Sequence, residues 1–159
     1  MSPDRLYFRQ LLSGLDFAVS DHLANQMVNF VYLIGDRRTR ECVVVDPAYA
    51  VNDLLRIVAN DDMKLTGVLA THYHPDHVGG SMMGMNIEGV AALLELQTVP
   101  IHVNENEANW VTRTTGISDG DLVKHSGGDK MFVGDIEITF VHTPGHTPGS
   151  QCFLVEQRL

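Results

Sequence analysis

The chain has 159 residues, of which 44% are hydrophobic and 19% are charged, and its formal net charge is −9. This size and composition fit one folded domain and exclude a disordered chain. The negative charge argues against nucleic acid as a partner, because the sequence has no basic patch to neutralise phosphates. No apolar run approaches the ~20 residues that span a bilayer, so no membrane association is expected.

The N-terminal segment, residues 1–14, has early charged and polar residues and no apolar core, so it does not fit a signal peptide. The two cysteines, Cys42 and Cys152, lie far apart in apolar, strand-like runs, and no C-x-x-C spacing is present. We expect both to be buried free thiols in a reducing cytoplasm.

In chain order, the apolar patterns predict strands that alternate with helices. Residues 27–36 and 41–47 predict a hairpin, whose second strand ends at a proline. A helix from Val51 has its apolar residues on one face, and a short apolar strand is expected at 65–71. Helices are expected next at 86–97 and 104–116, with a short strand at 99–103 between them.

The last third of the chain begins with residues 118–130, which predict a polar loop rich in Gly and Asp. Residues 130–143 predict a second hairpin, residues 142–150 a Pro/Gly loop, and residues 151–159 a last strand. The alternation indicates a single α/β domain of packed layers over residues 1–159, with no internal repeat or linker.

The segment H-Y-H-P-D-H, His72 to His77, follows the predicted strand directly. In an extended backbone, residues two apart point the same way, so His72 and His74 can converge on one point. Pro75 bends the chain, and Asp76 and His77 can then face a second, adjacent point. We expect a loop at the strand end, where binding groups are commonly presented. Imidazole and carboxylate donors at this spacing favour a metal site over a polar surface loop.

A second histidine loop, "FVHTPGHTPGS", follows the apolar strand pattern that ends near residue 142. Its prolines and glycines fix an unusual path and let the backbone approach another group closely. We favour His146 over His142 as a ligand, because His146 lies within the loop and His142 lies at the end of the strand.

These two segments together predict a catalytic metal site. His72, His74 and His146 would form a tripod with an open fourth position, where the pKa of a bound water can fall to ~7. Asp76 would either share a second metal with His77 or act as the base that steers the water.

Other candidate residues have simpler interpretations. His102 is expected to pack in a short strand, and His22 and His125 to be solvated in polar loops. Trp110 is expected to anchor the core from the helix at 104–116. Packing is also the preferred role of three methionines that follow the histidine segment, Met82, Met83 and Met85.

The motifs themselves resemble those of a known family. His72-x-His74-x-Asp76-His77 resembles the H-x-H-x-D-H signature of the metallo-β-lactamase superfamily. Residues 142–150, "HTPGHTPGS", resemble the second metal-binding loop of its glyoxalase II-like and persulfide-dioxygenase-like members. Asp46, in "VVVDP", resembles the buried aspartate that supports the site there. The resemblance runs from about residue 27 to the chain end.

This resemblance implies an αββα sandwich with its metals at one edge of the two sheets. In binuclear members, His72, His74 and His146 would bind the first metal, and Asp76 and His77 would share the second. In mononuclear iron members, His72 or His74, or both, would bind the metal with His146. The implied cofactor is one or two zinc ions, with iron or manganese as alternatives.

The function implied by the resemblance is a hydrolase, in which metal-bound hydroxide attacks a small-molecule substrate. A thioester is the leading substrate class, as in glyoxalase II-like members. Two alternatives stay open: a mononuclear iron sulfur (persulfide) dioxygenase, and a catalytically inactive truncated metal-binding domain.

Members of this superfamily continue beyond the matched segments, with a bridging aspartate and a final histidine. The resemblance therefore implies only the N-terminal part of the sandwich, with its C-terminal part missing. Sheet surface left uncovered in this way would favour self-association.

Overall fold

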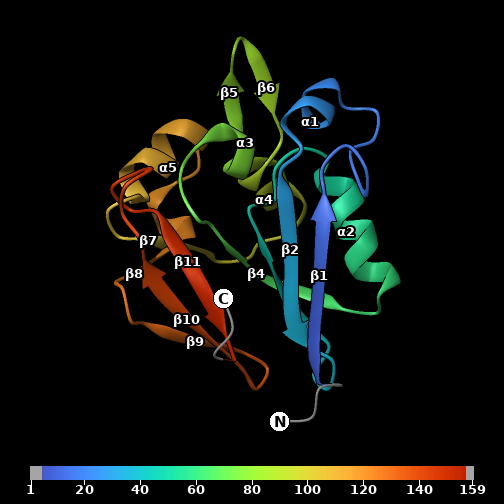
Figure 1. Cartoon of the computed structure of the whole chain (residues 1–159), viewed down its shortest axis with the longest axis vertical. Coiled ribbons are helices and arrows are strands. Elements are labelled where there is room, and N and C mark those ends of the chain that lie inside the picture. The colour runs from blue at the N-terminus through green and yellow to red at the C-terminus, as the bar shows by residue number, and fades with distance from the viewer. Residues whose placement is uncertain (1–4, 157–159) are drawn as a thin grey trace.

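The computed structural model describes residues 5–156, and its largest element is a six-stranded sheet, called the large sheet below (Figure 1). Its first three strands are antiparallel, and the remaining neighbours are parallel. In spatial order the strands are β1 (Leu6–Leu12), β2 (Phe30–Asp36), β3 (Glu41–Val45), β4 (Lys64–Leu69), β7 (Ile101–Asn104) and β8 (Leu122–His125).

A second, antiparallel sheet of three strands, the small sheet, faces the large one across an apolar layer. Its strands, in spatial order, are β11 (Gln151–Val155), β10 (Ile136–His142) and β9 (Lys130–Val133). A separate hairpin, β5 (Gly80–Met82) and β6 (Met85–Ile87), projects beyond the ends of both sheets (Figure 1).

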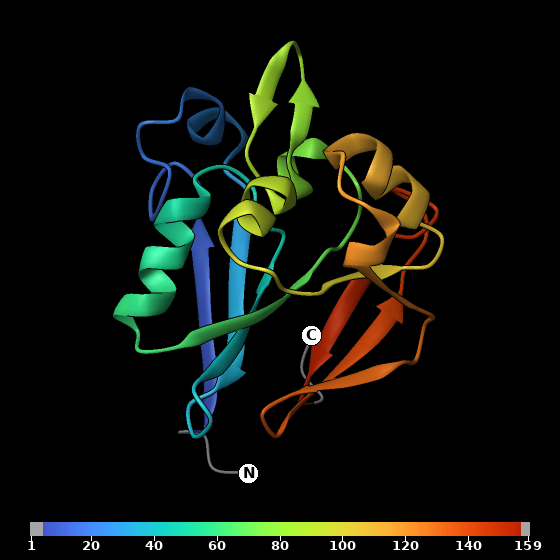
Figure 2. The same ribbon diagram turned by 180° about the vertical axis from the view of Figure 1, so that it is seen from behind.

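Helices cover the face of the large sheet that is turned away from the small sheet, where α2 and α4 lie (Figure 2). The layers are therefore helix, sheet and sheet, which confirms the α/β class and its sandwich type. None of the helices among residues 5–156 is long and apolar enough to cross a membrane. The helices are α1 (His22–Met27), α2 (Val51–Asn60), α3 (Pro75–Val78), α4 (Val90–Leu96), α5 (Ala108–Thr115) and a 3-10 turn at Asp119–Asp121.

Strand β3 shows why the central strands read as continuous apolar runs. Val44 packs in the core between the large sheet and the helices, whereas Val43 and Val45 pack in the core between the two sheets. Successive side chains of a strand point to opposite faces, so a strand with both faces buried needs apolar residues at every position. The end of β3, at residue 45, therefore lies inside the molecule, between the helix layer and the small sheet.

The N-terminal third contains two elements that the sequence patterns did not predict. Strand β1 pairs with β2 along its whole length, and helix α1 precedes β2. The predicted strand at 27–36 is therefore wrong at its start: Met27 ends α1, and the strand begins at Phe30. The helix begins after Asp21, whose side chain accepts a hydrogen bond from the backbone N–H of Ala24 at 3.0 Å.

The helix predicted at 86–97 is too long at its start. Residues 85–87 form β6, and α4 covers only Val90–Leu96. Gly89 separates them in an extended conformation, with φ of −170°. A Cβ atom there would lie 2.1 Å from the carbonyl oxygen of Val78, so this position needs glycine for close backbone approach.

The polar loop predicted at 118–130 is wrong in its first half, because residues 122–125 form β8. This strand pairs in parallel with β7 and closes one edge of the large sheet. Its partner is supplied by tertiary structure, so the polar sequence "DLVKH" alone does not reveal it. The helix expected at 104–116 is confirmed in part as α5, and the last strand as β11, although residues 157–159 lie outside the described part.

Several predicted burial states are wrong. Cys152 is exposed, whereas Cys42 is buried, and both are free thiols. Trp110 is 43% exposed rather than a core anchor, and Met83 is 76% exposed rather than packed. His125 is buried rather than solvated, because β8 places it against the ring of Phe140, with ring centroids 3.8 Å apart.

Candidate metal centre

The site is built at the ends of the parallel strands β3 and β4. Asp46 follows β3 and Thr71 follows β4, and parallel strands that end together place such residues side by side. Asp46 accepts hydrogen bonds from the backbone N–H of Thr71 at 2.8 Å and from its hydroxyl at 2.6 Å. This buried carboxylate fixes the point where the histidine segment leaves the sheet, as the sequence prediction for Asp46 expected.

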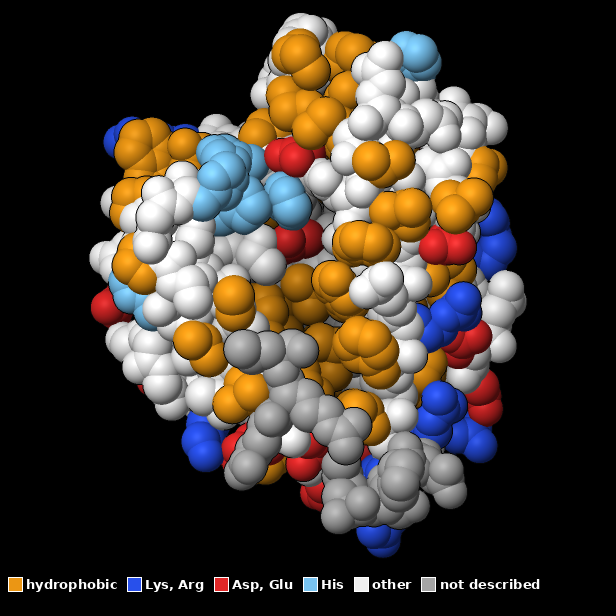
Figure 3. All heavy atoms as spheres, viewed as in Figure 1, with side chains coloured by type: hydrophobic (Ala, Val, Ile, Leu, Met, Phe, Trp, Pro, Cys, Tyr) orange, Lys and Arg blue, Asp and Glu red, His pale blue; other side chains and the backbone are white. Residues whose placement is uncertain are grey.

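Three histidines from two distant segments meet at this edge. The rings of His72 and His74 follow β4, and the ring of His146 comes from the loop between β10 and β11. Their ring centroids lie 4.7 to 4.8 Å apart, and Nδ1 of His74 is 3.1 Å from Nε2 of His146. Figure 3 shows histidine side chains gathered at one place on the surface, beside acidic side chains.

The donor atoms fit a metal ion. The ligand nitrogens of His72, His74 and His146 all lie within 4.8 Å of one another. Nδ1 of His72 lies 2.8 Å from the Thr71 hydroxyl, whereas its Nε2 is buried without a hydrogen-bond partner among the described residues. A buried polar atom without a partner is costly, and coordination would satisfy it. Two nitrogens on one tetrahedral zinc lie about 3.3 Å apart, close to the His74–His146 spacing.

The electrostatics favour the neutral imidazoles that metal binding requires. Burial, followed by the charge of His77, lowers the pKa of His72 to about 4. Burial and the neighbouring His146 also lower the pKa of His74 below its ordinary value. Both rings are therefore deprotonated at neutral pH, with lone pairs available to a cation.

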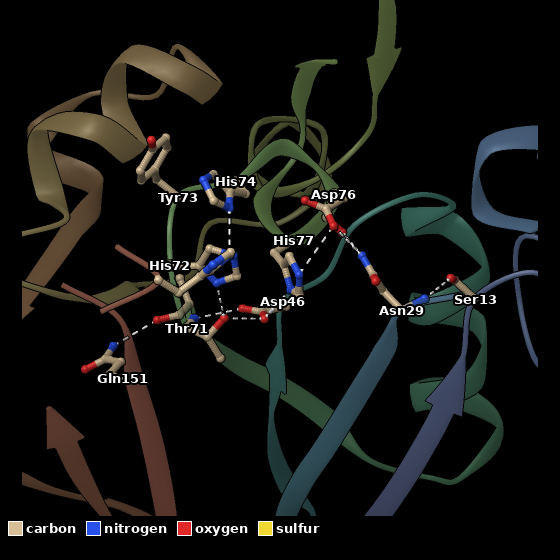
Figure 4. A network of polar contacts seen from close by, with 12 residues as sticks. Ser13, Asn29, Asp46, Thr71, His72, Tyr73, His74, Asp76, His77 and Gln151 are labelled. Atoms are coloured by element: carbon tan, nitrogen blue, oxygen red, sulfur yellow. Dashed lines mark hydrogen bonds and ion pairs between the residues drawn. The ribbon is translucent and has the colours of Figure 1, made fainter. Parts of the chain in front are cut away.

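A second group adjoins the first on the side of α3 (Figure 4). Nδ1 of His77 donates to Oδ2 of Asp46 at 2.8 Å, and Nε2 of His77 lies 3.4 Å from Oδ2 of Asp76. Burial works to lower the pKa of His77, but the hydrogen bond and charge of Asp46, with Asp76, raise it overall. Asp46, His72 and His77 also place ligand atoms within 4.8 Å of one another.

Asp76 is held by Asn29, the residue before β2. The side-chain amide of Asn29 donates to Oδ2 of Asp76 at 2.8 Å and to its backbone oxygen at 2.9 Å. The backbone N–H of Asn29 in turn donates to the Ser13 hydroxyl at 2.9 Å (Figure 4). Residues at the end of β1 and the start of β2 therefore take part in positioning the acidic side of the site.

All five predicted site residues lie at this one edge, and their role as ligands remains a prediction. His142 lies apart from the histidine tripod, with Nε2 3.0 Å from the backbone oxygen of Pro148. His102 is buried as predicted, and its Nδ1 lies 2.8 Å from Nε2 of His125.

Four supporting residues were missed by the sequence prediction: Asn29, Thr71, Glu107 and Gln151. Gln151 donates from Nε2 to the backbone oxygen of Ala70 at 2.8 Å, and its backbone N–H donates to Thr71 at 3.1 Å. These bonds attach the start of β11 to the end of β4. None of the four lies within a motif, although Thr71 and Gln151 each adjoin one, so the sequence carried little signal for them.

The chain is similar to several known proteins. The metallo-beta-lactamase superfamily profile matches residues 25–158. An uncharacterized protein of Aquifex aeolicus is 34% identical over 136 residues, covering 79% of this chain and 59% of that protein. A hydroxyacylglutathione hydrolase of Pseudomonas paraeruginosa is 34% identical over 121 residues, covering 76% of this chain and 40% of that protein.

Among solved structures, ETHE1 from Myxococcus xanthus superposes with a TM-score of 0.69 at 29% sequence identity. The match covers 94% of this chain and 54% of that one. The chain thus matches 59% of the length of the Aquifex aeolicus protein and 40% of the length of the Pseudomonas paraeruginosa hydrolase. Because the profile covers nearly the whole chain and the histidine motifs stand at one sheet edge, the chain belongs to the metallo-beta-lactamase superfamily.

Proposed function

We propose that the protein is a metal-dependent hydrolase that acts on a thioester or ester-type small molecule. The observation that carries this proposal is the convergence of His72, His74 and His146, with Nε2 of His72 buried and without a partner among the described residues. A purely structural histidine cluster would satisfy that nitrogen. Three imidazoles beside two carboxylates match the donor set of a catalytic zinc or iron site.

A zinc or iron ion held by the three histidines would act as a Lewis acid toward water and the substrate's carbonyl oxygen. Asp76 is the proposed base. Its Oδ2 is engaged by Asn29 and His77, which leaves Oδ1 to take the proton from water. The water oxygen bonds to the carbonyl carbon, the carbon–sulfur bond breaks, and the leaving sulfur takes the proton held by Asp76, so the products are a carboxylic acid and a thiol. Asp46 takes no part in bond making and holds Thr71 and His77 in place.

The thioester class is supported by relatives rather than by a pocket in this chain. Hydroxyacylglutathione hydrolases, such as the Pseudomonas paraeruginosa protein at 34% identity, are named for a thioester substrate. We expect zinc as the metal, with iron or manganese as alternatives, because imidazole ligands suit several of these ions.

Metal content tests the proposal first. Protein purified without chelator should contain about one zinc or iron ion per chain, and His146→Ala should lose most of it, since a closed tripod needs three ligands. The metal-loaded wild type should then hydrolyse a hydroxyacylglutathione, measured as thiol release with a thiol reagent. A loaded wild type that releases no thiol from this or other thioesters would exclude the thioester assignment.

A second candidate is a mononuclear iron sulfur (persulfide) dioxygenase. One observation favours a single ion: among the described residues the ligand nitrogens of the tripod have no hydrogen-bond partner outside the tripod, whereas Asp76 and His77 are already engaged by Asn29 and Asp46. Iron in the purified protein, with oxygen uptake when a persulfide is added, would support this candidate over hydrolysis. A metal-binding chain without either activity would support the third possibility, an inactive metal-binding domain.

A further inference from the structure

Glu107 is a buried acid that no proposed step uses. It lies at the start of α5 and is 1% exposed. No cation pairs with it among the described residues, and burying a carboxylate without compensation is strongly unfavourable. Hydrogen bonds from neutral groups must therefore stabilise this buried carboxylate.

Both oxygens of Glu107 accept hydrogen bonds, and the donors come from the two histidine segments. Oε1 accepts from the backbone N–H of Tyr73 at 3.0 Å, and Tyr73 stands between His72 and His74. Oε1 also accepts from the hydroxyl of Thr147 at 2.7 Å, and Thr147 directly follows His146. Oε2 accepts from the backbone N–H of Gly149 at 2.9 Å. Hydrogen bonds to a carboxylate are stronger than those between neutral groups.

The second loop is shaped to receive this carboxylate. A Cβ atom on Gly149 would lie 2.7 Å from Oε2 of Glu107, so only glycine allows this approach. The Ser150 hydroxyl lies 2.7 Å from that of Thr147 and accepts from the Thr147 backbone N–H at 3.0 Å. The Thr147 hydroxyl is thereby oriented toward Glu107. These contacts give a physical reason for the T-P-G-S sequence after His146.

We propose that Glu107 is a positioning residue that sets the spacing of the two histidine segments, and so the affinity of the tripod for its metal. This inference rests on the proposed metal site but adds a residue outside its motifs. The bridge is short: one carboxylate connects the backbone beside His74 to the residue beside His146. Gln151 joins the same two segments through Ala70 and Thr71, so loss of Glu107 should loosen the tripod without dispersing it.

Two variants and a control test this role. Glu107→Ala removes all three bonds. Glu107→Gln keeps one acceptor oxygen and places an amide donor where the other stood. The variant can therefore accept hydrogen bonds from Tyr73 and Thr147, or from Gly149, but not from all three. Tyr7→Phe is the control, because it removes a hydrogen bond to Asp61, 2.6 Å long, at the opposite end of β4.

Zinc affinity, measured by competition with a chromogenic chelator, should fall about tenfold or more in Glu107→Ala, the size expected for partners behind metal ligands. Glu107→Gln should be intermediate, and Tyr7→Phe should stay within about twofold of wild type. The absorption spectrum of the cobalt-loaded protein should change in Glu107→Ala only. Wild-type affinity in Glu107→Ala, or an equal loss in Tyr7→Phe, would overturn the proposal.

A metal-free measurement separates this inference from the proposed function. In the metal-free protein, amide hydrogen exchange at Tyr73 and Gly149 should speed up together in Glu107→Ala, and at one of the two in Glu107→Gln. Unchanged exchange at both sites would overturn the bridge. If wild type bound no metal at all, the proposed function would fail, while the exchange result would still decide whether Glu107 joins the segments.

Discussion

Asp46 Oδ2 lies 2.8 Å from Nδ1 of His77 and 2.6 Å from the hydroxyl of Thr71. One buried carboxylate thus joins the end of β3, the end of β4 and helix α3. Asp46 itself has φ of 54°, a left-handed conformation that asparagine and aspartate tolerate better than most residues. The residue type is therefore constrained both by its backbone and by its contacts.

Asp46→Asn tests this relationship with little change of shape. The backbone conformation should be kept, but the amide nitrogen cannot accept a hydrogen bond, so Thr71 or His77 loses its partner. We expect the free energy of unfolding to fall by about 1–3 kcal/mol in urea titrations, with weaker zinc binding. Asp62→Asn is the matched control, because Asp62 has φ of 59° and a side chain that is 77% exposed. The control should stay within about 0.5 kcal/mol of wild type.

Acid stability should depend on Asp36 in β2. Burial works to raise the pKa of this carboxyl, but hydrogen bonds from the Arg5 side chain and from the backbone of Asp135 and Arg38 lower it to about 2. Because this folded pKa lies below the ordinary value of 3.8, the stabilisation is present above that pH and is lost as the pH falls toward 2.

Asp36→Asn should therefore be less stable than wild type at neutral pH, and the difference should shrink between pH 4 and 2. Unfolding free energies across this range measure the effect. Asp119→Asn is the control, because Asp119 is 66% exposed in its pair with Lys124. A constant difference between Asp36→Asn and wild type would contradict the role of this carboxylate.

Mild acid should lower the stability of the fold because of His102 in β7. Burial, followed by the charge of His125, lowers the pKa of His102 to about 4. The unfolded state then binds more protons between about pH 6.5 and 4, so stability should fall as the pH drops through this window.

Replacing His102 with phenylalanine removes this titrating group and keeps a ring in the core. The loss of unfolding free energy between pH 7.5 and 4.5 should be about 2 kcal/mol smaller in His102→Phe than in wild type. His22→Gln, a change at an exposed histidine, is the control and should stay within about 0.5 kcal/mol of wild type in unfolding free energy at pH 7.5. An identical profile in His102→Phe would assign the acid sensitivity to other residues.

The junction before α4 should not tolerate a side chain. In Gly89→Ala, the Cβ atom would lie 2.1 Å from the backbone oxygen of Val78, so the segment after the histidines must shift. We expect destabilisation of about 1–3 kcal/mol or more, measured by thermal and chemical denaturation. Gly120→Ala should differ from wild type by under about 0.5 kcal/mol, because its nearest neighbour would be at 3.5 Å.

We expect self-association through an aromatic face of β1 and β2. Phe8 is 49% exposed and Phe30 is 45% exposed, and both rings lie beside Tyr32, with centroids 5.8 and 6.2 Å away. Figure 3 shows hydrophobic side chains exposed on the side of the molecule where these strands face the viewer. Exposed patches of this kind commonly mark contact surfaces.

Light scattering over a range of concentrations tests this expectation. The mean mass of wild type should rise with concentration, and the double substitution Phe8→Thr and Phe30→Thr should reduce the rise. Leu15→Thr is the control, because Leu15 is 69% exposed but lies outside these strands. A monomer at every concentration would exclude self-association by this face.

The sequence predicted the placement of the histidines better than the elements around them. The motif His72 to His77 and the preference for His146 over His142 rest on local backbone rules, and the structure brings these residues to one edge. Strand β1 was missed because its alternation is weak, with charged Arg9 and polar Gln10 side by side between apolar residues. Strand β8 was missed because parallel pairing at a sheet edge is decided by tertiary contacts.

The burial of single residues around the site was also difficult to predict from the sequence. Glu107 lies in the polar sequence "NENEANW", where both acidic residues look equally solvated, yet Glu105 is exposed and Glu107 is buried among hydrogen-bond donors. Trp110 was expected in the core from its residue type, but it stacks on Tyr73 at the surface, with ring centroids 5.5 Å apart. Burial of single polar and aromatic side chains depends on neighbours that are distant in sequence.

The tripod also joins the two sheets. His74 follows the large sheet and His146 follows β10 of the small sheet, and the two residues are 72 positions apart. An ion held by both would act as a cross-link that closes a long loop and so restricts the unfolded chain. Removing it would leave only the apolar core and the hydrogen bonds of Glu107 and Gln151 to join the two sheets at this edge. Chelation should therefore expose the segment between them to proteases, so the abundance of the protein in a cell should follow its metal supply.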